Sequence, residues 1–280
     1  GPVKPRKSLM VGVAGVGGLF LGCLLVLGRA ALHRGVENPD VIERMGLPVY
    51  AGIPFSKAQL SLEASFHKKG RATNRRSVDT TLLAMKNPAD PAIEAIRSLR
   101  TSLHFAMLEA NDNRLVITGP SPGIGKSFIS INLGAVCAQG GQRVLVVDAD
   151  LRKGHVHDAF GGRSDGGLSN LLAGQAQFHD VVRPTEQEGL SYVARGSAPP
   201  NPAELLMSQR FAEFLAQASE HYDLVLIDTP PILAVTDAAI ISKQCGTTLM
   251  VARFQMNPVK ELQVATRRLE TAGVELKGAI

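Results

Sequence analysis

The 280-residue sequence is poor in the residues that form disulfides and metal clusters. Its three cysteines, Cys23, Cys137 and Cys245, are widely spaced and form no CxxC pair, so we expect no disulfide framework and a reducing compartment. His155 and His157 are the one pair of histidines with metal-like spacing. Because no third ligand accompanies them, both are predicted to be surface residues.

The longer part of the chain also lacks an excess of positive charge. Residues 1–78 contain 12 Lys and Arg against 4 Asp and Glu, whereas residues 79–280 contain 18 against 21. The net charge of +5 therefore comes from the amino-terminal part. A surface that follows the phosphates of DNA needs the opposite distribution, which argues against nucleic acid as the main partner.

Charged residues are absent from a run of 19 residues between Leu9 and Leu27. As a helix this run would be about 28 Å long, close to the hydrocarbon thickness of a bilayer. A buried core helix rarely has so long an uncharged run, and the run is long for a cleaved signal peptide. We therefore predict a transmembrane helix over residues 9–32. Basic residues on both sides leave its orientation open: Lys4, Arg6, Lys7, Arg29, His33 and Arg34.

Acidic residues are missing between Ala64 and Val78, and we predict a flexible linker there. The linker either is attracted to anionic lipid, at about 1 kcal/mol per basic residue, or is a solvated tether. The sequence favours neither alternative. The basic residues of this stretch are Lys68, Lys69, Arg71, Arg75 and Arg76.

The strongest signal in the sequence is a glycine-rich loop between a predicted strand and a predicted helix. Leu115–Thr118 is apolar and β-branched, and Phe128–Gln139 has helical spacing and ends at two glycines. This order places backbone N–H groups and a helix amino terminus around an anion, as in a P-loop that binds Mg-ATP. The predicted cofactor-binding residues are Gly123, Ile124, Gly125, Lys126, Ser127 and Phe128.

Within this loop the Lys126 ammonium would contact the β- and γ-phosphates of ATP, and the Ser127 hydroxyl would bind Mg²⁺. The strict P-loop pattern has a glycine where this chain has Pro120. Pro120 and Pro122 have no N–H group and cannot donate a hydrogen bond to a phosphate. The phosphate cradle must therefore depend on residues 123–127.

Two further apolar strands are predicted, and each ends in acidic residues. The strand over residues 144–147 is followed by an Asp-x-Asp-x-Arg motif, and the strand over residues 224–227 by one aspartate. Three such strands predict an α/β, P-loop NTPase fold, with a mostly parallel central sheet flanked by helices and preceded by one transmembrane helix. The residues at these two strand ends are Asp148, Asp150, Arg152 and Asp228.

The three segments resemble the Walker A, A′ and B motifs of the bacterial tyrosine kinases: GPSPGIGKS, VLVVDADLRKG and VLIDTPP. This family belongs to the wider group of MinD- and ParA-like P-loop ATPases. The lysine that this group has early in the loop is missing, because Ser121 stands at that position. The Asp-x-Asp-x-Arg form of the second motif is similar to the kinase branch.

Two other stretches extend the resemblance over essentially the whole chain. Pro2 and Pro5, in a basic run before the span, resemble the end of the chain-length-determinant region of polysaccharide co-polymerases. The segment EAIRSLR matches the family's ExxRxxR oligomerisation motif, and on a helix it would form a polar stripe beside an apolar face. The stripe consists of Glu94, Arg97 and Arg100, and the apolar face of Ile96, Leu99 and Leu103.

The resemblance is closest to the Wzc type of capsule and exopolysaccharide kinases, and it implies four parts. Residues 1–8 would end a periplasmic proline-containing segment, 9–32 would be the transmembrane helix, 33–80 the juxtamembrane segment with its basic linker, and 81–280 a cytoplasmic P-loop tyrosine-kinase domain. The implied location is the bacterial inner membrane. The implied partners are other copies in a ring-like homo-oligomer that phosphorylates in trans, polysaccharide polymerase and export proteins, a tyrosine phosphatase and membrane lipid, without nucleic acid.

The implied reaction transfers the γ-phosphoryl group of ATP to a tyrosine hydroxyl, with Mg²⁺ as cofactor. Either Asp148 or Asp150 would accept the hydroxyl proton, and Arg152 would stabilise the site or a neighbouring subunit. The resemblance implies Lys126, Asp148, Asp150 and Arg152 as catalytic residues, and Ser127, Asp148 and Asp228 as metal ligands.

The chain departs from this pattern in its tyrosines. Kinases of this type end in a run of tyrosines, whereas Tyr50, Tyr192 and Tyr222 are scattered and the last residues, VELKGAI, have the apolar character of a strand. We therefore expect part of a longer protein, without its tyrosine tail. His155 stands where close relatives often have a tyrosine, and Tyr222, beside an apolar strand, is predicted to be a packing residue.

Two alternatives to a kinase remain. One is a MinD- or ParA-like ATPase without tyrosine kinase activity, against which Ser121, the Asp-x-Asp-x-Arg motif and the span all count. The other is a membrane-anchored ATPase scaffold of an export machinery, in which nucleotide acts as an assembly switch. The scaffold needs the same P-loop as the kinase, so the sequence barely separates these two.

Overall fold

The structure is a computed structural model that describes residues 7–32, 35–36, 38–72, 80–108 and 112–280. Its strands are β1 (Arg114–Thr118), β2 (Val144–Asp148), β3 (Val182–Pro184), β4 (Leu190–Val193), β5 (Leu224–Asp228), β6 (Thr247–Met250) and β7 (Gly278–Ala279). Its helices are α1 (Lys7–Leu32), α2 (Pro39–Glu43), α3 (Lys57–Ala72), α4 (Leu83–Lys86), α5 (Pro91–Leu108), α6 (Lys126–Gln139), α7 (Val156–Ala159), α8 (Leu168–Leu172), α9 (Phe178–Val181), α10 (Pro202–Leu206), α11 (Gln209–His221), α12 (Asp237–Ser242) and α13 (Val259–Thr271).

The strands form one sheet in the order β3-β4-β2-β5-β1-β6-β7. All neighbouring pairs are parallel except β3 with β4. β5 lies between β2 and β1, so the three motif-bearing strands are adjacent and their carboxyl ends meet at one edge. The expected fold class, a mostly parallel sheet flanked by helices, is confirmed.

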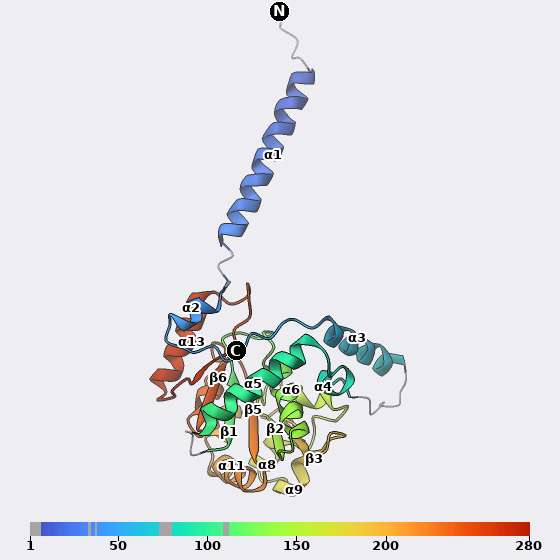
Figure 1. Ribbon diagram of the computed structural model, residues 1–280, viewed down its shortest axis with the longest axis vertical. Coiled ribbons are helices and arrows are strands. Elements are labelled where there is room, and N and C mark those ends of the chain that lie inside the picture. Colours follow the sequence, from blue (N-terminus) through green and yellow to red (C-terminus); the bar gives the residue numbers. More distant parts are fainter. Residues whose placement is uncertain (1–6, 33–34, 37, 73–79, 109–111) are drawn as a thin grey trace, which may run out of the picture.

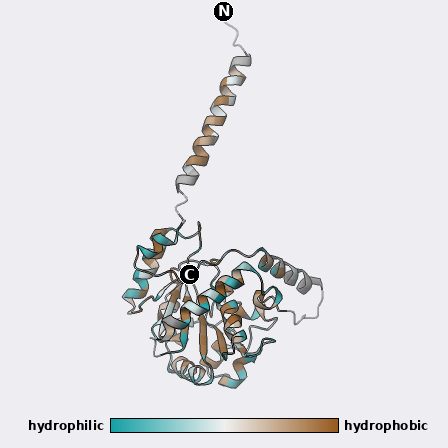
Figure 2. Cartoon of the chain, in the orientation of Figure 1, coloured by the Kyte–Doolittle hydropathy of each residue, from teal (hydrophilic) through white to brown (hydrophobic). Residues whose placement is uncertain are grey.

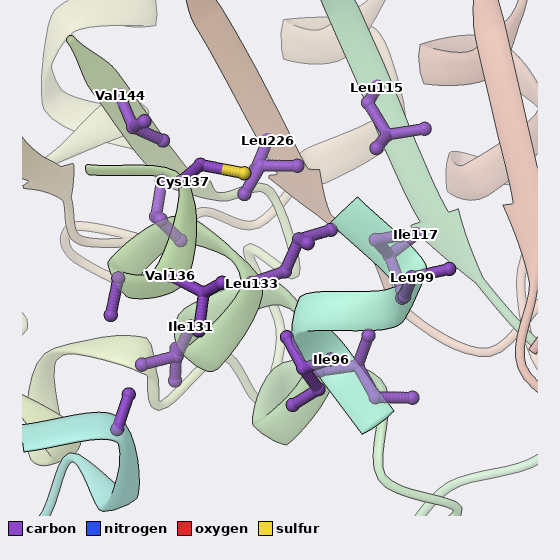
Figure 3. Close-up of a cluster of buried hydrophobic side chains, with 14 of the residues drawn as sticks. Ile96, Leu99, Leu115, Ile117, Ile131, Leu133, Val136, Cys137, Val144 and Leu226 are labelled. Carbon is purple, nitrogen blue, oxygen red and sulfur yellow. The ribbon is translucent and has the colours of Figure 1, made fainter. Parts of the chain in front are cut away.

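Each face of the sheet has its own hydrophobic core, because alternate strand residues point to opposite faces. On one face Leu115, Ile117 and Leu226 pack against α5 and α6, as Figure 3 shows. On the other face Val116 and Val225 pack against residues of α8 and α11. Burial on both faces explains why the strands are uninterrupted apolar runs.

The predicted strands and helix agree closely with the structure. β1 and β5 each extend the predicted strand by one residue at an end, and α6 begins at Lys126, two residues before the predicted start. α6 ends as expected, since Gly141 has a φ of +89° just beyond the helix. The strand-like character of the last residues is also confirmed, since β7 pairs parallel with β6.

The amino-terminal helix α1 contains a 19-residue stretch, Met10–Gly28, with a mean hydropathy of 2.4 and none of it buried. Length and composition are those of a membrane-spanning helix. In Figure 2, brown hydrophobic residues follow α1 and the central strands, and teal hydrophilic residues occur in the surrounding helices and loops. The flanking residues Lys4, Arg6, His33 and Arg34, like Pro2 and Pro5, lie outside the described residues, as do the side chains of Lys7 and Arg29.

The prediction of a flexible linker from Ala64 is wrong as far as Ala72, because α3 continues to that residue. A side-chain bond from Gln59 to Glu63, one turn apart, supports the helix, and no proline interrupts it. The prediction was based only on the charges of this stretch and did not take its helical spacing into account. Arg75 and Arg76 lie outside the described residues, and so do the side chains of Lys68, Lys69 and Arg71.

The segment between α1 and α3 is attached to the globular body at two places. Val36 donates its N–H to the carbonyl of Asn257 and accepts from the N–H of Gln255, both at 2.9 Å. Further along, the Tyr50 N–H donates to the Ala279 carbonyl at 2.9 Å. In Figure 1, α2 and α13 accordingly lie on the side of the body nearest to α1, and α11 lies on the opposite side.

Candidate functional site

The glycine-rich loop connects β1 to α6 at the carboxyl edge of the sheet. Gly123 and Gly125 have φ angles of +72° and +106°, a backbone conformation that residues with a side chain rarely adopt. This conformation turns the chain sharply into α6. The unpaired N–H groups of the first turn of α6 therefore face the loop, which is the arrangement that binds phosphate.

Lys126 opens α6 and is 8% exposed. Its ammonium donates a long hydrogen bond, 3.4 Å, to the carbonyl of Ser121. Burial lowers the pKa of Lys126, while the negative charges of Asp228 and Asp150 oppose that shift. A buried ammonium between two carboxylates and a phosphate-type loop suits the triphosphate of a nucleotide.

Ser127 and Asp228 are brought together from α6 and the end of β5. The Ser127 hydroxyl donates to the Asp228 carboxylate at 2.6 Å, and the Ser130 hydroxyl donates to its other oxygen at 3.2 Å. Burial raises the pKa of Asp228, and the bond from Ser127 and the charge of Lys126 oppose that shift. A hydroxyl and a carboxylate beside a phosphate cradle are the ligand types that Mg²⁺ takes in nucleotide sites, so these residues fit that ion.

Asp148 lies beside Asp228, because the two residues are register partners at the ends of β2 and β5. Its carboxylate is fully buried and accepts the Val156 N–H at 3.0 Å. Its other oxygen has no hydrogen-bond partner among the described residues. A Cβ on Gly154 would lie 2.0 Å from this oxygen, so only glycine fits over the carboxylate.

Burial raises the pKa of Asp148 well above its usual range, and the negative charge of Asp228 adds to that shift. Asp148 does not line the cleft at the carboxyl edge, whereas Asp228 and Asp150 do. Of the three aspartates predicted for this site, the structure therefore brings two to the cleft surface. The third, Asp148, is buried beneath them.

Asp150 is half-buried and shapes the turn after β2. One of its oxygens accepts the N–H groups of Arg152 and Lys153, at 3.1 and 2.9 Å. The Arg152 guanidinium is bound to Asp237 at the start of α12, through nitrogen–oxygen distances of 3.0 and 3.3 Å. Arg152 is thus held in an ion pair with a buried carboxylate, which the sequence did not predict.

The cleft has a volume of about 1630 Å³. Its floor is the P-loop with the end of β5 and the turn after β2, including Ile124, Asp150 and Asp228. One wall comes from the segment between α1 and α3, including Val36 and Phe55. The segment between α1 and α3 therefore belongs to the site, although its sequence carries no nucleotide-binding motif.

Two residues of the loop after β6 hold the P-loop from outside. The Arg253 guanidinium donates to the Gly123 carbonyl at 2.8 Å, and the buried Asn257 amide donates to the Ser121 hydroxyl at 2.6 Å. These bonds fix the part of the loop where Pro120 lacks an N–H group. Sequence reasoning missed both residues, because more than 120 positions separate them from the loop.

The three residues of the ExxRxxR motif lie on α5, but they do not form one exposed stripe. Glu94 and Arg97 pair with each other near the start of the helix. Arg100 donates instead to the Val136 carbonyl at 3.1 Å, near the carboxyl end of α6. The apolar face is confirmed, because Ile96 and Leu99 are fully buried.

All three tyrosines are held by packing. Tyr192 is 4% exposed and stacks on Phe160 with ring centroids 4.7 Å apart. Tyr222 is partly buried against the core, as predicted. The Tyr50 hydroxyl donates to the Lys277 carbonyl at 3.1 Å.

The two histidines after β2 differ in their surroundings. His155 is exposed and lines the cleft, in agreement with the prediction of a surface residue. The prediction is wrong for His157, whose side chain is 13% exposed. Burial lowers its pKa, because a charged imidazole loses hydration there.

Comparison with known proteins identifies the family. Residues 115–255 match the model of an AAA domain. The chain is 48% identical to the tyrosine-protein kinase wzc of Salmonella typhimurium over 280 residues, and 48% identical to the tyrosine-protein kinase etk of Escherichia coli over 282 residues. All of this chain is covered in both cases, but only 38% and 39% of the relatives, so the chain spans a little over a third of their length.

Solved structures give the same assignment. The kinase domain of the Escherichia coli tyrosine kinase ETK is 48% identical, with a TM-score of 0.79 over 88% of this chain and 94% of that domain. The MinD protein of Pyrococcus horikoshii, complexed with Mg-ADP, has a TM-score of 0.51 at 21% identity over 60% of this chain and 68% of its own, and shares the fold. The P-loop, the two acidic strand ends and these similarities together show that the chain belongs to the AAA-domain family and, within it, to the bacterial tyrosine kinases of the Wzc and Etk type.

Proposed function

We propose that the chain is the membrane-anchored catalytic part of an ATP-dependent protein-tyrosine autokinase that regulates the polymerisation and export of capsule or exopolysaccharide. The observation that carries the proposal is the gathering of Lys126, Ser127, Asp228 and Asp150 in one cleft at the carboxyl edge of the sheet. The relatives at 48% identity, named as tyrosine-protein kinases, support it.

In this proposal the N–H groups of residues 123–128 and the Lys126 ammonium bind the phosphates of ATP. Mg²⁺, when bound to Ser127 and Asp228, would neutralise charge on those phosphates. Preorganised donors and positioning account for most of the acceleration in phosphoryl transfer, and this cleft supplies both.

The chemical step forms a bond between the tyrosine oxygen and the γ-phosphorus and breaks the bond from that phosphorus to the β–γ bridging oxygen, which leaves with ADP. The tyrosine proton passes to a carboxylate. Asp150 is the better acceptor of the two candidates, because it lines the cleft, whereas Asp148 is fully buried. Asp148 would act indirectly, through its charge beside Asp228.

Arg152 would act as a positioning residue. Its ion pair with Asp237 ties the turn that carries Asp150 to α12. Because Asp237 is almost fully buried, loss of Arg152 would leave an unpaired buried charge and shift the turn.

The remaining parts of the proposal concern the cell. α1 would anchor the protein in the bacterial inner membrane with the globular domain in the cytoplasm. Copies would associate in a ring through the side of α5 that carries the exposed Glu94 and the half-buried Arg97, with Arg100 bracing α5 on α6. Polymerase and export proteins and a tyrosine phosphatase would be the other partners.

The acceptor tyrosine would not be one of the three in this sequence, because Tyr50, Tyr192 and Tyr222 all pack within the folded chain. The test is transfer of labelled phosphate from ATP to a tyrosine-rich peptide by the purified chain, with a phenylalanine-substituted peptide and the Lys126→Met variant as controls. Transfer to tyrosine supports a kinase. Phosphate release without transfer would favour the ATPase scaffold, and labelling by the Lys126→Met variant would reveal a contaminating kinase.

A further inference from the structure

The loop Arg253–Asn257, between β6 and α13, exposes two large apolar side chains. Phe254 is 62% exposed and Met256 is 47% exposed. Gln255 between them has a φ of +53°, the only positive value for a non-glycine residue in the described chain. This left-handed residue makes a tight turn, and its neighbours Phe254 and Met256 are exposed on either side of it, with Phe254 also among the residues that line the cleft.

The loop is fixed to the chain directly after the amino-terminal helix. Gly35 forms an antiparallel bridge with Pro258, and Val36 forms the two backbone bonds to Gln255 and Asn257 described above. A Cβ on Gly35 would lie 2.4 Å from the Gln255 backbone, so the two segments are in close contact. The position of the loop therefore follows the position of Gly35.

Chain length limits how far this contact can lie from a bilayer that α1 crosses. The apolar stretch ends at Gly28 and α1 ends at Leu32, which adds about 6 Å of helix. Three more residues reach Gly35 and span at most about 11 Å. Gly35 thus lies within about 17 Å of the hydrocarbon, of which the headgroup layer occupies about 5 to 8 Å. Because this distance is the upper bound for a fully extended chain, any shorter path brings the loop closer to the headgroup layer.

The charges near the loop are mixed. Asp40 and Glu43 lie on α2, and Arg253 lies in the loop with its guanidinium 5.5 Å from the Phe55 ring centre. Phe55 is itself 63% exposed. Because acidic and basic groups are both present near the loop, its attraction to a membrane would come from the apolar side chains and would not require anionic lipid.

We propose that Phe254 and Met256 insert into the headgroup layer of the bilayer that α1 spans. The proposal rests on the membrane anchoring in the proposed function. Because Arg253 and Asn257 of the same loop hold the P-loop, the bilayer would contact the element that shapes the phosphate site. The partner is phospholipid, recognised by its apolar interface.

The sequence has no tryptophan, so a single introduced tryptophan reports one position. The Phe254→Trp variant of the full chain is reconstituted in nanodiscs of neutral phosphatidylcholine with acyl chains brominated near the headgroup. We expect its fluorescence to fall at least twofold relative to unbrominated nanodiscs. The matched control is Met207→Trp, because Met207 is also 62% exposed but lies two residues before α11, which is on the side of the body opposite to α1 (Figure 1). Its fluorescence should not change.

Equal fluorescence of the Phe254→Trp variant in both lipids would overturn the proposal. Two other outcomes, each without quenching by brominated lipid, would also overturn the proposal. If the tryptophan is shielded from acrylamide only at high protein concentration, the loop takes part in self-association. If it is shielded only when Mg-ATP is added, the loop contacts nucleotide. If Phe254→Trp does not fold, Met256→Trp gives the same measurement. A chain that fails to co-purify with nanodiscs would refute the anchoring itself, whereas an anchored chain without quenching would refute only the loop contact.

Discussion

Charged side chains at the two ends of the parallel sheet differ in their exposure and in their pairing. At the amino end, Arg143 and Asp223 form an exposed pair at 2.7 Å, with side chains 62% and 41% exposed. At the carboxyl end, Lys126, Asp148 and Asp228 are 8%, 0% and 2% exposed and form no ion pair within 4.0 Å among the described residues.

This difference separates stability from function. Exposed pairs cost little to form and contribute little, because water screens them. Buried charges that form no ion pair oppose folding, and favourable interactions elsewhere in the protein must compensate for them. Such charges are retained where a charged ligand completes the site, so the carboxyl end has the electrostatics of a binding site and the amino end those of an ordinary surface.

The largest expected effect is that of Lys126→Met. Without the ammonium the phosphates lose their main neutralising charge in the transition state, which costs several kcal/mol, so phosphoryl transfer should fall by about 1,000-fold or more. Methionine has a similar length and no charge to bury, so the melting temperature should not fall. Transfer that stays within tenfold of the parent would show that the lysine does not contact the transferred group.

Asp148→Asn should stabilise the ligand-free protein, by an amount that grows with pH. Because the pKa of Asp148 is raised in the folded state, its ionised form opposes folding, and stability is lost as the pH rises above the ordinary aspartate pKa near 4. The amide keeps an acceptor for the Val156 N–H and removes the charge. The variant should melt only slightly above the parent at pH 5 and by a larger margin at pH 8.

The control for this change is the phosphoryl-transfer rate at pH 8, which should fall while the melting temperature rises. If Asp148→Asn melted below the parent at pH 8, the carboxylate would be stabilised by its surroundings, contrary to the comparison between the two ends of the sheet.

Ser121→Ala should weaken nucleotide binding by about two- to tenfold. The change removes the hydrogen bond from Asn257, which is worth about 0.5 to 1.5 kcal/mol, and loosens the loop segment that Pro120 leaves without an N–H donor. Calorimetry with Mg-ATP gives the dissociation constant. Ser98→Ala on α5, which removes a serine bond to the Glu94 carbonyl, is the matched control and should leave affinity unchanged.

The smallest effect is expected for Arg143→Ala at the amino end. Because the pair with Asp223 is exposed, its loss should change the melting temperature by no more than about 2 °C and leave phosphoryl transfer unaltered. A clear drop in either quantity would show that the two ends of the sheet are not as different as their exposures indicate.

Local patterns made much of this architecture predictable. The runs at residues 115–118, 144–147 and 224–227 are strands buried on both faces, and such strands read as uninterrupted apolar segments. The glycines of the P-loop and the aspartates at two strand ends follow directly from chemistry at a parallel-sheet edge. These features depend on residues that are close together in the sequence, so one sequence is enough to predict them.

Contacts between distant residues could not be predicted in this way. Asp237 binds Arg152 across 85 positions, and Asn257 reaches Ser121 across 136. Neither Asp237 nor Asn257 lies in a recognisable motif, so only the tertiary fold brings each of them to its partner. The depth of Asp148 is another example, since only the fold shows that Gly154 covers it.

The double attachment of the segment after α1 has a mechanical consequence. Tension applied through α1 would act first on the two backbone bonds between Val36 and residues 255 and 257, before it reached the bonds of Pro48 and Tyr50 with Ala279. The first contacts to yield under a pull would therefore belong to the loop that braces the P-loop. Nucleotide affinity would respond to force on α1 before the sheet itself began to separate.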